Sequence, residues 1–267
     1  MVLNNKILKS AIALFAAFIL FTVLIGVLGV KTVIPAQVYD GEAVSEVVIT
    51  EQESDDETCF DLGLAGINTG FFNAVGYHSM LEKLTKLLGY IALLTVALFG
   101  AYGAYQLITA KSLKGVDTEI IILGVFYVVV LVFYVLFEKL VINYRPVVFD
   151  EGLEASYPSS HTMLVIAVML TAPNQLIRIL GDRGTLIKII KPVCYAIIAV
   201  MVIGRLLSGV HWLTDIIGGV ILSLSLVKFY EAVMDIILGE DTPDRNYMPP
   251  AAKGVSSGKK GGAHLAR

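Results

Sequence analysis

Residues Glu119–Phe137 read EIIILGVFYVVVLVFYVLF, an apolar run in which Glu119 is the one charged residue. At about 1.5 Å of rise per residue, an α-helix of this length comes close to the ~30 Å thickness of a bilayer's hydrocarbon core. A helix also satisfies all of its backbone hydrogen bonds within one spanning segment. The stretch therefore predicts a transmembrane helix.

Five further stretches have the same character. They are Ile7–Val30, Leu88–Ile108, Ser160–Leu176, Pro192–Leu207 and Trp212–Leu238. The whole chain is 56% hydrophobic and 16% charged, whereas soluble domains carry about a quarter charged residues. The sequence therefore predicts an all-α fold, a polytopic membrane helical bundle with six transmembrane helices.

The predicted spans divide the chain into four parts. These are a first transmembrane helix in 1–30, an outer acidic loop and interfacial segment in 31–87, a helical core of five transmembrane helices in 88–238, and a disordered cytoplasmic tail in 239–267. The first apolar run is longer than a signal-peptide core and no small-x-small cleavage pattern follows, so we expect it to be retained. The acidic run between Asp40 and Asp61 favours a solvated segment over a calcium site, because the EF-hand pattern is absent.

Lysine and arginine are distributed unevenly between the two sets of loops, and these residues collect on the cytoplasmic side of most membrane proteins. With the N-terminus inside, six spans return the C-terminus to the same side. Of the 20 Lys and Arg residues, 13 then lie in inner segments, Lys228 lies in the last span, and six are outer, namely Lys31, Lys83, Lys86, Lys139, Arg145 and Arg205. The bias predicts a multi-pass cell-membrane protein with both termini in the cytoplasm.

The polar residues suited to chemistry gather at span ends. In this topology they all lie on the extracytoplasmic side, although only the Lys and Arg count was used to choose the orientation. They are Lys139, Arg145, Ser159, Ser160, His161, Arg205, His211 and Asp215. A single Arg near a span end often only extends to the headgroups, and a single His there is often structural. Three clusters on one side favour a catalytic site instead.

Each group has a role that fits phosphoryl transfer. His211 and Asp215 are spaced i,i+4, so on a helix they share a face, and the carboxylate can orient the imidazole while its other nitrogen attacks. Arg145 and Arg205 present forks of donors that match phosphate oxygens. The predicted helix start at Ser159, Ser160 and His161 exposes backbone N–H groups that favour an anion. Such a site needs neither a metal nor another cofactor.

The chain resembles the type 2 phosphatidic acid phosphatase family of membrane lipid phosphatases, over roughly Glu119–Leu238. That family carries Lys-x6-Arg-Pro, then Pro-Ser-Gly-His, then Ser-Arg-x5-His-x3-Asp. The matching residues here are Arg145-Pro146, Pro158-Ser159-Ser160-His161, and Arg205, His211 and Asp215 at the same spacing.

Three positions depart from the family pattern. Ser160 replaces Gly and Gly204 replaces Ser. The first-motif Lys position holds Glu138, and Lys139 comes one residue later, which on a helix rotates the side chain by about 100°. Either Lys139 reaches the phosphate through its long stem, or the site does without that cation.

The resemblance implies a mechanism. His211 is the nucleophile that forms a phosphohistidine, Asp215 orients it, and His161 protonates the leaving oxygen and then activates water. The substrate-binding residues that it implies are Arg145, Arg205, Ser159, Ser160 and Lys139. The substrate is then a lipid phosphate held among membrane lipids, and phosphatidic acid, phosphatidylglycerol phosphate and a polyprenyl pyrophosphate such as undecaprenyl pyrophosphate all fit.

Three alternatives stay open from sequence. A lipid phosphotransferase would pass the phosphate from His211 to an acceptor other than water. A non-catalytic anion or lipid-phosphate binding or transport protein would use the arginines alone. A vanadate-dependent haloperoxidase has a similar site, but such enzymes are largely soluble. No nucleic-acid partner is indicated, and the sequence specifies no oligomeric state.

Overall fold

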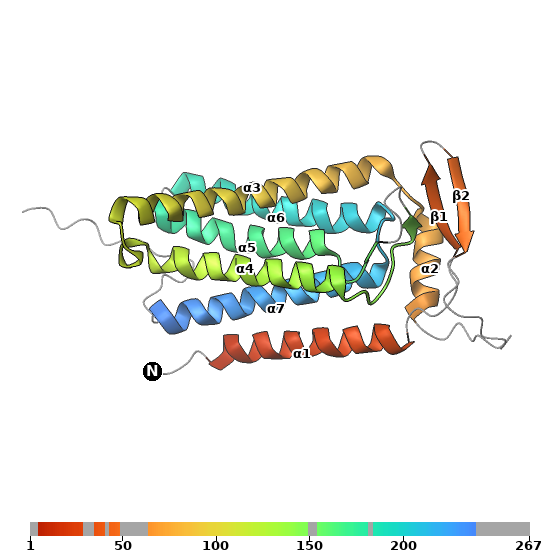
Figure 1. Cartoon of the computed structure of the whole chain (residues 1–267), viewed down its shortest axis with the longest axis horizontal. Helices are drawn as coiled ribbons and strands as arrows, with labels where there is room; N and C mark the ends of the chain where they lie inside the picture. The colour runs from red at the N-terminus through yellow and green to blue at the C-terminus, as the bar shows by residue number, and fades with distance from the viewer. Residues whose placement is uncertain are drawn as a thin grey trace, which may run out of the picture.

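The computed structural model describes residues 5–28, 35–40, 43–48, 64–148, 154–180 and 184–238. Within these residues, six long helices run side by side as a bundle (Figure 1). They are α1 (Asn5–Leu28), α3 (Ser79–Ala110), α4 (Thr118–Lys139), α5 (Ser160–Leu180), α6 (Gly184–Leu207) and α7 (Leu213–Leu238). A short 3-10 helix, η1 (Leu113–Gly115), connects α3 to α4.

One end of the bundle, which we call the sheet end, carries a short helix and a small β-sheet (Figure 1). The helix is α2 (Leu64–Val75). Strand β1 (Pro35–Asp40) pairs antiparallel with β2 (Ala43–Val48) and parallel with β3 (Val147–Val148). Because β3 belongs to the loop between α4 and α5, this sheet joins the first loop to the segment that precedes α5.

All six long helices are long and apolar enough to cross a membrane, which confirms the predicted bundle. In α5 and α7, 56% of the residues in the most apolar part of the helix are buried, against 28% or less in the other four helices. Helices α5 and α7 therefore form the centre. Large apolar side chains on the outer helices are exposed, such as Leu20 and Leu98, as expected for surfaces that face lipid.

The boundaries differ from the sequence prediction in three places. The end of the predicted interfacial segment forms the first turns of α3. The predicted boundary between residues 87 and 88 therefore falls inside a helix. Helix α6 begins at Gly184, which places Pro192 inside it instead of at its start. Strands β1 and β2 occupy part of a segment predicted as a loop. The predicted tail and most of the acidic run lie outside the described residues.

Helix α1 is packed into the bundle along α7. The Ser225 hydroxyl of α7 donates a hydrogen bond of 3.1 Å to the Ala11 carbonyl. Near the sheet end, the ring of Phe18 stacks on Tyr157 at a centroid distance of 6.2 Å, and Phe137 of α4 meets Tyr157 edge to face. Tyr157 lies just before α5, so α1 contacts the loop that leads into the candidate site.

Candidate active site

His211 and Asp215 meet where α6 turns into α7. The turn passes through Gly209, whose φ of +70° is a conformation suited to glycine. A Cβ on Gly209 would also collide with the carbonyl of Gly76. This tight turn places His211 just before α7 and not on it, yet its Nδ1 still lies 3.6 Å from Asp215 Oδ2.

Asp215 occupies the first turn of α7 and is completely buried. Its Oδ2 accepts a 2.8 Å hydrogen bond from the Trp212 backbone N–H and a second bond from the Ser156 hydroxyl. The Trp212 indole in turn donates to the Tyr144 carbonyl at 2.7 Å. These bonds fix the start of α7 against the loop between α4 and α5, so the carboxylate is held by donors from two segments.

The imidazole of His211 is 3% exposed. Burial, and then the positive charges of Arg205 and Arg145, lower the pKa of His211 well below its ordinary value. The imidazole is therefore neutral at physiological pH and keeps a free lone pair. Its Nε2 is buried and has no hydrogen-bond partner among the described residues, so no described donor occupies its lone pair.

His161 and Arg205 form the second cluster. His161 lies in the first turn of α5, and its Nδ1 is 3.3 Å from Nη2 of Arg205 at the end of α6. Because a guanidinium can only donate, Nδ1 accepts, and in the neutral ring the proton sits on Nε2. The Nε2–H of His161 is thus available to donate a hydrogen bond. Gly89 of α3 makes room for it, since a Cβ there would come within 2.9 Å of His161 Cδ2.

Arg205 is completely buried. Besides contacting His161, it donates from Nη1 to the Thr85 hydroxyl at 3.3 Å, and its Nε has no partner within the part of the chain that the structure describes. Buried donors are almost always satisfied in native proteins. An unsatisfied guanidinium N–H beside two histidines is therefore suited to an anion.

Arg145 lies in the loop between α4 and α5, where Tyr144 and Ala155 form an isolated antiparallel bridge. Its guanidinium forms an ion pair of 2.8 Å with Glu154 and also faces the Ala155 carbonyl, with its Nε 3.4 Å from that oxygen. Arg145 is near enough to act on the His211 charge. The structure thus brings together both arginines, both histidines and Asp215.

The two serines before His161 have different positions. Ser159 is completely buried, its hydroxyl pairs with the Thr162 hydroxyl at 3.0 Å, and its backbone N–H donates to the Asp215 carbonyl at 3.0 Å. Ser160 instead lines the large cavity described below. Of the two, Ser160 is the one placed to meet a ligand there.

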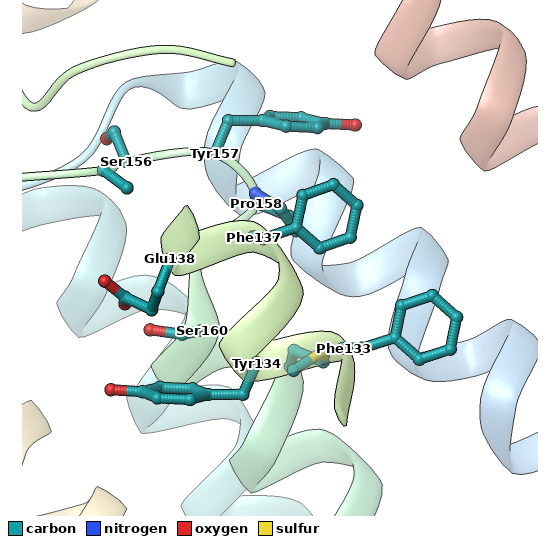
Figure 2. Close-up of a pocket in the computed structure, with 10 residues that line it drawn as sticks. Phe133, Tyr134, Phe137, Glu138, Ser156, Tyr157, Pro158 and Ser160 are labelled. Carbon is teal, nitrogen blue, oxygen red and sulfur yellow. The ribbon is translucent and has the colours of Figure 1, made fainter. Parts of the chain in front are cut away.

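The structure does not bring Lys139 to this cavity. Lys139 is the last residue of α4 and is exposed. Its neighbour Glu138 lines a small pocket of about 10 Å³ together with Tyr134 and Ser160, and all three side chains project to the same side (Figure 2). The one-residue shift from the family pattern therefore replaces a cation by a carboxylate. Lys86 of α3 does line the large cavity.

Sequence reasoning missed the contributions of α3 and of the loop before Pro158. Residues Glu82, Thr85, Lys86 and Gly89 are spaced i, i+3, i+4 and i+7, and this spacing of polar and small residues was the available signal. Glu82 is buried and pairs with Lys86 at 2.6 Å. No local pattern marked Ser156, which contacts both His211 and Asp215.

A cavity of about 1150 Å³ opens beside these residues, between α3 and α4. At the sheet end it is lined by polar residues, among them Arg145, Ser160 and His161. Its other walls are largely apolar and continue along α3 as far as Leu107 and along α4 as far as Ile120. From Lys86 to Leu107 the helix rises by about 30 Å, which matches the hydrocarbon core of a bilayer.

The chain is similar to known proteins in part of its sequence and in its fold. The family model of the PAP2 superfamily matches residues 120–235. A crystal structure described as the first transmembrane PAP2 type phosphatidylglycerolphosphate phosphatase from Bacillus subtilis superposes with a TM-score of 0.54 at 19% identity, covering 85% of this chain and 97% of that one. At this identity the match shows a shared fold. A search of curated proteins found no match. The resemblance that the motifs indicated is thus confirmed, and residues 120–235 carry the pattern of the PAP2 superfamily.

Proposed function

We propose that this protein is an integral membrane phosphatase that hydrolyses a lipid phosphate or a polyprenyl pyrophosphate. One observation carries the proposal. A single cavity joins a polar end, with Arg145, Ser160 and His161, to apolar walls that extend for about the thickness of a membrane. A headgroup phosphate fits the polar end while its hydrocarbon tail lies between α3 and α4. The neighbour described as a phosphatidylglycerolphosphate phosphatase supports the same substrate class.

The proposed reaction has two steps. The His211 Nε2 lone pair attacks phosphorus in line and the bond from phosphorus to the leaving oxygen breaks. His161, which carries a proton on both nitrogens once the phosphate takes Arg205 as its partner, gives its Nε2 proton to that oxygen and becomes neutral. In the second step, His161 takes a proton from water. The resulting hydroxide attacks phosphorus, and the P–N electron pair returns to His211. The charge on the equatorial oxygens is stabilised by Arg205, and by Arg145 once phosphate replaces Glu154 as its partner.

The proposed location is the extracytoplasmic face of the cell membrane. The site lies at the sheet end, and the first residues of α1 and the last residues of α7 lie at the opposite end of the bundle (Figure 1). The excess of Lys and Arg predicted on the side of both termini supports a cytoplasmic position for that opposite end. An enzyme of this orientation would act on the headgroups of the outer leaflet.

The first test of the function is phosphate release by the purified protein from phosphatidic acid, phosphatidylglycerol phosphate and a polyprenyl pyrophosphate, with EDTA present. We expect release from at least one of them, because two arginines and the start of α5 provide the positive charge that a metal would otherwise supply. Products are analysed with and without an acceptor lipid, which separates hydrolysis from phosphotransfer. A folded protein that releases no phosphate from any of the three would contradict the proposal.

Filling the apolar part of the cavity should impair long-chain substrates selectively. Gly100 lines the cavity, and a Cβ there would meet no atom within 4 Å. Gly100→Leu would therefore occupy the tail's space without disturbing the protein. We expect KM for a long-chain lipid phosphate to rise about tenfold, equivalent to about 1.4 kcal/mol of binding, with unchanged turnover of a short-chain, water-soluble phosphate ester.

Gly26 provides the matched control for this measurement. It lies on α1, where a Cβ would also meet no atom within 4 Å, and it is not among the residues that line the cavity. Gly26→Leu should leave KM unchanged for both substrates. If Gly100→Leu raised KM equally for the short and the long ester, or left both unchanged, the tail would not lie between α3 and α4.

A further inference from the structure

The Ser156 hydroxyl connects the two residues of the nucleophile pair. Its Oγ lies 3.1 Å from Nδ1 of His211 and donates a hydrogen bond to Oδ2 of Asp215. The direct distance from His211 Nδ1 to Asp215 Oδ2 is 3.6 Å, which is too long for a side-chain hydrogen bond. In this structure, therefore, His211 reaches its carboxylate through the hydroxyl.

The chemistry of a hydroxyl fixes the direction of this connection. Ser156 has one O–H to donate and two lone pairs that accept. Because its proton goes to Asp215, its oxygen accepts from His211, which requires the proton on Nδ1. The other ring nitrogen, Nε2, is then unprotonated, and this is the buried atom that has no partner among the described residues.

The surrounding loop holds Ser156 in place. The Ser156 backbone N–H donates to the Asn143 carbonyl at 2.8 Å. The next residue, Tyr157, points away toward α1 (Figure 2), where its hydroxyl pairs with that of Thr22 at 2.8 Å. A Cβ on Gly218 of α7 would collide with the Tyr157 ring. Ser156 is thus fixed between α1, the loop and α7, and it is 1% exposed.

We propose that Ser156 is a positioning residue that links His211 to Asp215 and holds His211 in the tautomer with Nε2 free to attack. The proposal rests on the proposed function, in which His211 attacks phosphorus. During attack the proton stays on Nδ1, and the positive charge that develops on the ring is stabilised by Asp215 through the hydroxyl. No proton moves along the link, and the electron pair returns to Nε2 when the P–N bond breaks.

A double-mutant cycle on kcat tests this link, with Ser156→Ala, Asp215→Asn and both changes together in the full chain. Ser156→Ala should lower kcat about ten- to a hundredfold with KM within about twofold, since the hydroxyl acts on the nucleophile and not on substrate binding. If Ser156 acts through Asp215 and His211, the double variant should be no slower than the slower single variant. Effects that multiply, or an unchanged kcat in Ser156→Ala, would overturn the proposal.

Ser223→Ala is the matched control. Ser223 is a buried serine on the helix that carries Asp215, and its hydroxyl donates to the Val220 carbonyl at 2.9 Å within that helix. We expect wild-type kcat from this variant. An equal loss of kcat in Ser223→Ala would show that removing any buried hydroxyl slows the enzyme, and it would overturn the specific role of Ser156.

The tautomer can also be measured without any Ser156 variant. The chain has four histidines, so ¹⁵N labelling of histidine gives few signals, and that of His211 is identified by its loss in His211→Ala. We expect the proton on Nδ1 in the unmodified chain, and a proton on Nε2 would overturn the proposal even if Ser156→Ala failed to fold. The measurement needs no turnover. Absence of phosphate release from every lipid would contradict the proposed function, whereas a proton on Nε2 would contradict the role of Ser156.

Discussion

Replacing His211 by alanine should reduce phosphate release from a lipid phosphate by at least about a thousandfold, as expected when a covalent nucleophile is removed. The neutral imidazole has a pKa lowered by burial and by the charges of Arg205 and Arg145, and its Nε2 is unsatisfied within the described part of the chain. Neither arginine can replace it as a nucleophile. The measurement is kcat on the best lipid of the panel.

His78→Ala is the matched control for that experiment. His78 is exposed, and its Nε2 lies 2.9 Å from the nearby Val75 carbonyl, so its loss should leave kcat unchanged. Rapid quenching of the reaction with labelled substrate tests directly for the phosphorylated enzyme. An acid-labile, alkali-stable phosphoenzyme should form in the unmodified chain and be absent from His211→Ala. Turnover that survives in a folded His211→Ala protein would exclude His211 as the nucleophile.

The fold was predictable because its strongest determinants are local. A stretch such as Glu119–Phe137 can satisfy its backbone in a membrane only as a helix, and α4 occupies 118–139. The convergence of the site followed from topology alone. If six spans alternate, residues at the end of one span and the start of the next lie on the same side, which places Arg145 with His161 and Arg205 with His211.

The positions that the sequence did not predict depend on contacts between distant segments. Ser156 matters because its loop meets α7 and α1 at once, and no residue pattern within the loop records that meeting. The first turns of α3 belong to the segment predicted as interfacial, because Leu81, Leu84 and Leu88 share a helical face there. The strands, in contrast, carry a local signal: Asp40-Gly41 between two valine-containing runs is typical of a tight hairpin, and Asp40 pairs with Ala43.

At the lysine position of the family's first motif, the sequence pattern and the structure point to different residues. The pattern directs attention to Glu138 and Lys139, and a shift by one residue turns a helical side chain by about 100°. In the structure, Glu138 lines the small pocket and Lys139 is exposed. The cations that line the large cavity are Lys86 and Arg145. The family motif identified Arg145, whereas Lys86 is identified by its position in the structure.

Arg205→Lys should reduce kcat about a hundred- to a thousandfold, the second largest effect that we expect. Arg205 is completely buried, and its guanidinium donates to His161 and Thr85 while Nε remains unsatisfied among the described residues. Lysine keeps the charge but loses the planar fork, so it cannot hold His161 and a phosphate oxygen together.

Arg145→Lys distinguishes this geometric role from a general need for charge. The Arg145 side chain is 11% exposed and is already paired with Glu154, so lysine can shift within the loop and still present its charge. We expect a loss of about tenfold there, mainly in KM, measured on the same lipid as Arg205→Lys. Equal losses in both variants would mean that the site requires only positive charge. A loss in Arg205→Lys confined to KM would mean that Arg205 binds the ground-state phosphate and does not act on the transition state, because an interaction made only in the transition state appears in kcat.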